Sequence, residues 1–189
     1  MIPSSSASLR DAERVLVELE HLIARGDGDG DAADALRDEF VALRDALPPS
    51  EQRLLEELAG DLDSLSDREI PDGSDTTNVG LRLDAALRSL DVSEFMRSVR
   101  AAPAAVAPWM KALWRGRGWS ALGRHYAATA FLERAIALNP TLPPGVRVLW
   151  LEELYRSGHI VIAAREALRF ANQLDAPPVV RLAALAVLY

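Results

Sequence analysis

Residues 109–140, WMKALWRGRGWSALGRHYAATAFLERAIALNP, decide the fold of this 189-residue chain. On both sides of Gly123, apolar residues recur every three to four positions, which is typical of two amphipathic helices joined by a tight turn. Pro140 ends the second helix, because proline lacks the N–H group that a helix interior needs. We expect Gly116 and Ala128 to be small because the two helices cross closely there.

The same stretch carries a distinct spacing of small, aromatic and proline positions, G-x2-aromatic followed by A-x3-L-x2-A-x4-P. In this spacing it resembles the tetratricopeptide repeat (TPR), a two-helix unit of about 34 residues. The leading Trp and Leu of the family are replaced here by Ala112 and Arg115. The residues that we expect to pack the repeat are Gly116, Trp119, Gly123, Ala128, Leu132, Ala135 and Pro140.

A second register begins at Trp119 and matches the head of the family motif, W-x2-L-G-x2-Y, letter by letter. It would place Pro140 inside the second helix, at a cost of about 3 kcal/mol, and it would lose the small residues of the tail. We therefore prefer the first register.

Related units flank this stretch. Pro103, Pro140 and Pro177 stand 37 residues apart, each after the end of a predicted helix, and this period is close to that of a helical repeat. The first two flanking helices are expected to form a degenerate repeat that caps the array. The helices expected on either side span residues 79–90, 93–101, 143–155 and 160–170.

The last segment, residues 177–189, reads PPVVRLAALAVLY and carries Arg181 as its only charge. An apolar helix of this kind needs a second helix to cover it. Three explanations stay open: the chain is a fragment of a longer array, the helix caps the array, or it packs on another copy of the chain. In the third, residues 177–189 form a homo-oligomer interface.

Residues 1–66 are expected to form an acidic unit of about three helices ahead of the array. Ser8 and Ser50 are the expected caps of its first and third helices. Residues 67–78 are polar and contain Pro71 and Gly73, which predicts a linker. The three helices are expected at residues 8–25, 31–46 and 50–65.

The fold class that follows is all-α. The resemblance implies antiparallel helix hairpins stacked as a short TPR-like solenoid over residues 79–189, and the acidic helical unit precedes it.

The net charge of −7 conceals an asymmetry between the two halves of the chain. Residues 1–92 hold 9 Arg and 22 acidic residues, a net charge of −13, whereas residues 93–189 hold 12 basic and 6 acidic residues, a net charge of +6. Either the acidic helices are simply well-solvated surfaces, or one half attracts the other half or an oppositely charged partner.

The sequence predicts a cytoplasmic protein with no membrane partner. The N-terminus, MIPSSSASLRD, lacks the apolar core of a signal peptide, and no run reaches about 18 apolar residues. Of the 21 basic residues, only Lys111 is not Arg. This bias is typical of a GC-rich genome, and we expect a bacterial source.

One acidic loop shares part of the pattern of a calcium site. Asp27, Asp29 and Asp31 alternate as calcium-loop ligands do, and Asp38 stands at the twelfth place. The sixth place holds Ala32 in place of glycine, and the twelfth lacks the bidentate Glu. A flexible acidic loop explains the same residues without an ion, so ion binding stays open and no metal site is assigned.

No set of residues has the spacing of a catalytic or cofactor site. The chain has no cysteine and three histidines, His21, His125 and His159. The last two each follow a turn glycine at the start of a second helix, where polar residues are common in such repeats. The glycine-rich stretches lack the Lys-Ser or Lys-Thr of a phosphate loop. We therefore expect a protein that is not an enzyme and binds no cofactor.

Binding of a partner molecule is the class of function that remains. In the family that the chain resembles, the first helices of successive repeats line a concave groove that holds an extended peptide or a helix. Arginines in such a groove suit carboxylates, so we expect a scaffold or adaptor whose partner is a protein or peptide segment of acidic character. The expected groove residues are Leu113, Arg117, Ser120, Ala121, Arg147, Trp150, Leu151 and Glu153.

Two alternatives to an autonomous adaptor remain. The chain is then either a regulatory or sensing module of a larger protein, in which the acidic helices mask the basic groove, or a homo-oligomerisation domain that uses its apolar C-terminal helix. A nucleic-acid partner is not expected, because the basic half carries only +6 and is tethered to an acidic half that repels phosphate.

Overall fold

The computed structural model describes residues 7–64, 91–103 and 106–172, together with the single positions 178 and 186. Every element assigned in these residues is an α-helix, so the all-α class is confirmed. The expected linker at 67–78, the expected helix at 79–90 and most of 177–189 lie outside the described residues. The helices are α1 (Ala7–Arg25), α2 (Asp31–Asp45), α3 (Pro49–Asp63), α5 (Val92–Arg100), α6 (Pro108–Ala121), α7 (His125–Leu138), α8 (Pro144–Arg156) and α9 (Ile160–Ala171).

Prolines set the starts of three of these helices. A proline occupies the first turn of α3, α6 and α8, where its fixed φ suits the helix and its missing N–H would have no partner in any case. The expectation that Ser50 caps α3 is therefore wrong, because α3 begins at Pro49 and no side chain caps it. Ser8 lies inside α1, which begins at Ala7, so it does not precede that helix as a cap. At α5, the Asp91 carboxylate accepts a hydrogen bond from the Glu94 backbone N–H at 2.9 Å.

Two glycines make the same turn after α6 and after α8. Gly123 and Gly158 have φ angles of +71° and +87°, which residues with a side chain rarely adopt. The residue after each glycine donates its backbone N–H to a carbonyl in the last turn of the preceding helix, from Arg124 to Trp119 and from His159 to Leu154, both at 2.9 Å. This pattern closes the helix C-terminus and reverses the chain.

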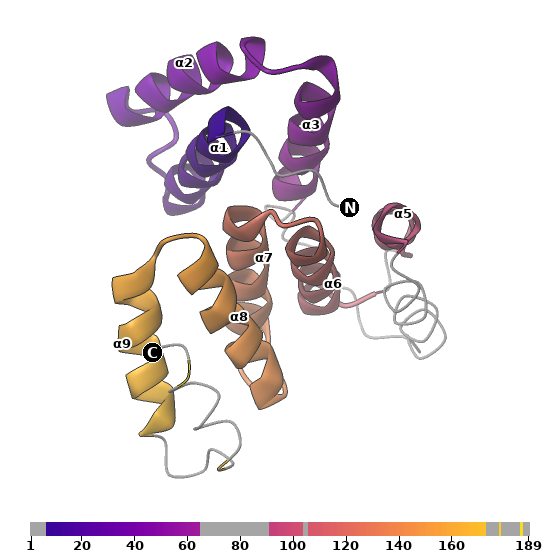
Figure 1. Ribbon diagram of the computed structural model, residues 1–189, viewed down its shortest axis with the longest axis vertical. Coiled ribbons are helices and arrows are strands. Elements are labelled where there is room, and N and C mark those ends of the chain that lie inside the picture. Colours follow the sequence, from indigo (N-terminus) through magenta and orange to yellow (C-terminus); the bar gives the residue numbers. More distant parts are fainter. Residues whose placement is uncertain (1–6, 65–90, 104–105, 173–177, 179–185, 187–189) are drawn as a thin grey trace.

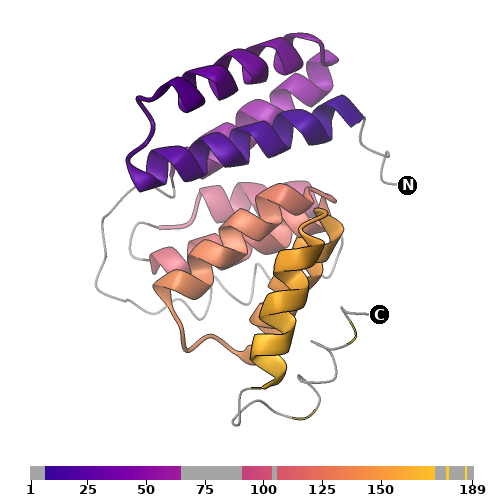
Figure 2. The ribbon, with the colours of Figure 1, turned by 90° about the vertical axis from the view of Figure 1, so that its left-hand side faces the viewer.

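The described helices form two groups that contact each other, α1 to α3 and α5 to α9 (Figure 1). In Figure 2, α1 and α2 run side by side in opposite directions with α3 behind them, above α5 to α9. Helix α1 also packs against α3 and α7, α6 packs against α5 and α7, and α8 connects α7 to α9. Helix α1 therefore contacts the middle of the chain at α7.

The main hydrophobic core crosses the expected boundary between the acidic unit and the array. It joins Leu16 of α1 and Leu58 of α3 to Phe95 of α5, Trp119 of α6 and Phe131 of α7, all of them buried. A separate small core, built around Leu151 and Phe170, lies within the α8–α9 hairpin. The described acidic helices thus share their core with α5, α6 and α7.

Helix α6 is central because two of its neighbours approach it closely. A Cβ added to Gly116 would lie 2.8 Å from Leu132 Cγ in α7, and one added to Gly118 would overlap Met96 Sδ in α5. Contacts this short do not occur between real side chains. Glycine at both positions therefore permits the packing of α6 against α5 and α7.

Candidate binding surface

The residues expected to pack the first repeat lie between α6 and α7 or at their ends. Gly116 faces Leu132 across the helix crossing. Gly123 makes the turn, and Pro140 is exposed two residues beyond the end of α7. The fully buried members of the set are Trp119, Ala128, Leu132 and Ala135.

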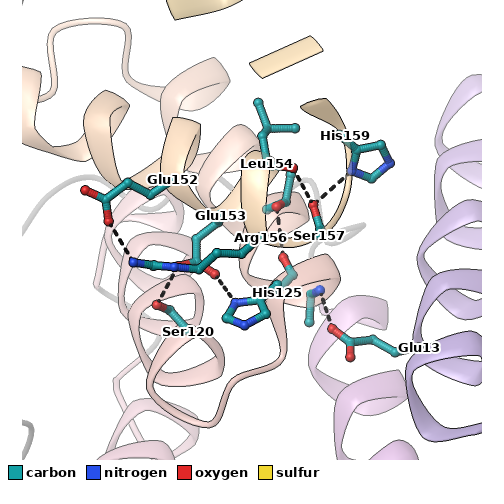
Figure 3. A network of polar contacts seen from close by, with 11 residues as sticks. Glu13, Ser120, His125, Glu152, Glu153, Leu154, Arg156, Ser157 and His159 are labelled. Atoms are coloured by element: carbon teal, nitrogen blue, oxygen red, sulfur yellow. Dashed lines mark hydrogen bonds and ion pairs between the residues drawn. The ribbon is translucent and has the colours of Figure 1, made fainter. Parts of the chain in front are cut away.

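The expectation that Glu153 lines a groove is wrong, because its side chain has no exposed surface. Its carboxylate accepts hydrogen bonds from Ser120 Oγ at 3.0 Å and from Arg156 at 2.7 Å, and it lies 2.8 Å from His125 Nδ1 (Figure 3). A buried carboxylate needs such partners in place of water. Since these partners come from α6, α7 and α8, Glu153 ties the second hairpin to the first.

The order of these contacts differs from that of a serine activated by a histidine base. In such a site the histidine stands between the hydroxyl and the acid, whereas here Glu153 stands between Ser120 and His125. A second contact joins Ser157 Oγ to His159 Nδ1 at 2.9 Å, but Ser157 is buried at the end of α8 and also bonds a backbone carbonyl there. Both sets of contacts hold helix ends together and do not present a nucleophile to a cleft.

Acidic side chains of the N-terminal helices reach the basic half at buried positions. Asp61 of α3 is 3% exposed and accepts hydrogen bonds from Arg100 of α5 at 3.0 and 2.9 Å, with Arg115 Nε of α6 at 3.5 Å. Glu13 of α1 is also buried and accepts a hydrogen bond from the Ala127 backbone N–H in α7. Burial raises the pKa of Glu13 to about 7, although the bond from Ala127 opposes this shift.

An open pocket of about 200 Å³ lies between α7, α8 and α9. Arg147 lies over the ring of Phe170, 5.7 Å from its centroid, and donates a hydrogen bond to a backbone carbonyl before α8. Arg169, whose side chain is 75% exposed, lies 3.7 Å from the Glu166 carboxylate. The pocket thus combines apolar surface with two arginines and one glutamate. The residues that line it are Ile136, Arg147, Trp150, Leu151, Glu166, Arg169 and Phe170.

One residue of the pocket lining, Trp150, has a polar atom without a partner. The indole Nε1 of Trp150 is buried and has no hydrogen-bond acceptor among the described residues. An indole N–H can only donate, and a buried donor without an acceptor is unusual in folded proteins.

The pocket brings together three of the expected groove residues, Arg147, Trp150 and Leu151. The four on α6 are not part of its lining. Leu113 packs in the core between α6, α7 and α8, and Ser120 bonds to Glu153. The other two, Arg117 and Ala121, are half-buried on α6.

Sequence reasoning missed the contributions of α7 and α9 to the pocket. Ile136 belongs to α7, and Glu166 and Phe170 stand one helical turn apart in α9. Residues four apart share a helix side, so this pair could have been recognised as one side of α9. The packing of α9 beside α8 was needed to place it next to Arg147.

No group of three His, Cys, Asp or Glu side chains is placed to hold a metal ion within the described ranges. At the acidic loop, Arg37 donates hydrogen bonds to the Gly28 carbonyl and to the Asp34 carboxylate, so a fixed cation already lies against it. Within the same ranges, every helix falls short of the length and hydropathy of a membrane span.

Comparisons of the chain with models of protein families, with curated proteins and with solved structures found no match.

Proposed function

We propose that the chain is a non-enzymatic adaptor or scaffold that binds an acidic segment of a partner protein in the pocket between α7, α8 and α9. The observation that carries the proposal is the pocket itself, with Leu151 and Phe170 beside Arg147 and Arg169. A large apolar side chain that fills it would contribute about 1.5 to 3 kcal/mol. A neighbouring carboxylate would reach the arginines, whose planar donors suit it. A bacterial cytoplasm is the setting that we propose.

We also propose that α6–α7 and α8–α9 are two stacked TPR-like repeats. Their turn glycines, Gly123 and Gly158, have the same left-handed conformation and the same closing hydrogen bonds. Five residues after each glycine, a buried alanine faces the first helix of its hairpin: Ala128 in α7 and Ala163 in α9. This correspondence supports a repeated unit with a period near that of the family.

The partner segment can be identified by selection of a phage-displayed library of random dodecapeptides on the immobilised full chain. We expect the enriched peptides to share a large apolar residue flanked by Asp or Glu. Binding of each synthesised peptide is then measured by fluorescence anisotropy against the full chain and against Arg169→Glu. We expect the variant to lose affinity on the order of tenfold or more, because it places a negative charge beside the peptide carboxylate.

Arg165→Glu is the matched control, because Arg165 is exposed on the same helix but does not line the pocket. It changes the net charge by the same amount and should leave binding nearly unchanged. Peptides that bind both variants equally, or a selection without enrichment, would overturn the proposal.

Masking of this surface by the acidic helices is a second candidate that the same assay addresses. The buried carboxylates Glu13 and Asp61 meet α7, α5 and α6 at residues outside the pocket lining, which favours the adaptor without masking. Masking predicts tighter peptide binding in salt above about 0.5 M, where charges are screened within a few ångström. Direct binding of an acidic peptide predicts weaker binding in the same salt.

A further inference from the structure

Exposed apolar residues concentrate on α9. One side of this helix carries Ile160, Ala164, Leu168 and Ala171, with no charged residue among them, and we call this set the α9 stripe. Ile160 is 56% exposed and Leu168 is 50% exposed. A contiguous apolar surface on a helix is typical of a docking site.

The two ends of the α9 stripe correspond to residues of α7 that meet α8, whereas Leu168 corresponds to the exposed Glu133. Counted from the glycine of each turn, Ile160 corresponds to His125, and Ala171 corresponds to Ile136. His125 contacts Glu153 of α8 at 2.8 Å, and Ile136 packs against the small core between α6, α7 and α8. The stripe is therefore the place where the next helix of a repeat array would lie.

A segment of this chain repeats the sequence of α8. Residues 177–189, PPVVRLAALAVLY, align without a gap to residues 143–155, PPGVRVLWLEELY, at an offset of 34, the period of the family. Pro178 and Ala186, the two described positions of the segment, are helical. The identical residues are Pro177, Pro178, Val180, Arg181, Leu185, Leu188 and Tyr189, seven of the thirteen.

The length of the connection before residues 177–189 and the length of the segment itself also fit a helix packed on α9. Residues 139–142 join α7 to residues 143–155, and residues 172–176 join α9 to residues 177–189. Both connections fall within the usual range for neighbouring helices. A helix of thirteen residues would span about 20 Å, which is close to the length of α9 with its twelve residues.

We infer that residues 177–189 bind the α9 stripe of the same chain as α8 binds α7, and so close the repeat array. In this arrangement Val187 stands opposite Ile160, where the first interface has Glu153 opposite His125. The polar pair Glu153 and His125 between α8 and α7 is thus replaced by the apolar pair Val187 and Ile160 between the segment and α9. Both residues of the pair must change together, because a buried polar residue that faces an apolar one would lack a hydrogen-bond partner.

The absence of cysteine from the chain allows a direct test. Ile160→Cys in the full chain is alkylated with iodoacetamide, and its rate is compared with that of Ile162→Cys. Ile162 is 44% exposed in the same helix but lies off the α9 stripe. We expect the cysteine at 160 to react on the order of tenfold more slowly, because a covered thiol reacts only when the segment detaches.

A second substitution then identifies the segment that covers residue 160. Added to Ile160→Cys, Val187→Glu should raise the alkylation rate to that of Ile162→Cys. Ala186→Glu should not, because Ala186 corresponds to Glu152 of α8, whose side chain is 42% exposed. Equal rates for the cysteines at 160 and 162, or protection that survives Val187→Glu, would overturn the inference. Protection found only in a dimer by light scattering, and lost on dilution, would assign the cover to a second copy and overturn it too.

Discussion

The carboxylate of Glu13 in α1 accepts a hydrogen bond from the backbone N–H of Ala127, 2.8 Å away at the N-terminus of α7. The first N–H groups of a helix have no partner within the helix, and Arg124, at the N-cap of α7, provides no side-chain cap. Glu13 therefore caps α7 from another helix. The N-terminal end of a helix favours a negative charge, but burial disfavours it, and burial dominates the pKa of Glu13.

The raised pKa of Glu13 predicts a pH dependence of stability. Burial raises this pKa from 4.5 to about 7. The folded state therefore holds the proton more tightly than the unfolded state, and its contribution to stability is complete below pH 4.5 and lost as the pH rises through about 7. Relative to Glu13→Gln, the free energy of unfolding of the natural chain should fall by about 3 kcal/mol across this window. Urea unfolding of both proteins at several pH values measures it.

Glu18→Gln is the control for this experiment, because Glu18 lies on the same helix with a side chain that is 47% exposed. It should shift the free energy of unfolding by less than about 1 kcal/mol, as expected for an exposed ion pair with Arg14. A difference between the natural chain and Glu13→Gln that stays constant across the window would contradict the prediction.

The contact of Asp61 with Arg100 and Arg115 predicts that the docking of α3 depends on a buried charge. Asp61→Asn would leave two partly buried guanidinium groups without their carboxylate, and we expect the free energy of unfolding to fall by about 3 to 5 kcal/mol. Glu57→Gln removes a second partner of Arg100, 3.0 Å away, but Glu57 is 45% exposed. Its loss should cost less than about 1 kcal/mol. Equal losses of unfolding free energy for the two substitutions in urea would show that the buried charge of Asp61 contributes no more than the exposed charge of Glu57.

Local signals in the sequence were sufficient for the described helices and for the turns at Gly123 and Gly158, but not for the caps expected at Ser8 and Ser50. Positive-φ glycines at 123 and 158, and prolines in the first turns of α6 and α8, mark the ends of helices whose apolar period is clear. These signals act between residues that are close together in the chain, so they can be recognised without knowing the three-dimensional structure.

The buried acids could not be predicted in the same way. Glu13, Asp61 and Glu153 each lie within or beside an apolar stripe, and this unusual position was a signal that could have been noted. Their partners Ala127, Arg100 and Ser120 are 114, 39 and 33 residues away. A helical period tells which side of a helix is apolar, but not which distant group meets an acid there. The pocket required the same long-range information, because three helices line it.

The crossing of α6 and α7 predicts opposite effects for two glycine substitutions. Gly116→Ala places a Cβ 2.8 Å from Leu132 Cγ, and because Leu132 is fully buried we expect a loss of about 1 to 3 kcal/mol. Gly60→Ala in α3 meets nothing within 4 Å. It should stabilise the chain by about 0.5 to 1 kcal/mol, because alanine restricts the unfolded chain and favours the helix. Thermal unfolding of both variants gives the signs, and a stabilising Gly116→Ala would mean that the helices do not cross closely.

The neighbouring glutamates of α8 give the sharpest comparison of buried and exposed charge. Glu153 is fully buried and joins Ser120, His125 and Arg156, whereas the Glu152 side chain is 42% exposed and only meets Arg156 at 3.3 Å. Glu153→Gln removes the charge that these donors share, and we expect the free energy of unfolding to fall by about 3 kcal/mol.

Glu152→Gln removes the same charge one residue away and should cost less than about 1 kcal/mol. Because Glu153 links α8 to α6 and α7, its substitution should also speed hydrogen exchange in α8 and α9 more than in α1. Exchange that rises equally in all helices would show that the two hairpins open together with the rest of the fold, and that Glu153 does not hold a separable junction.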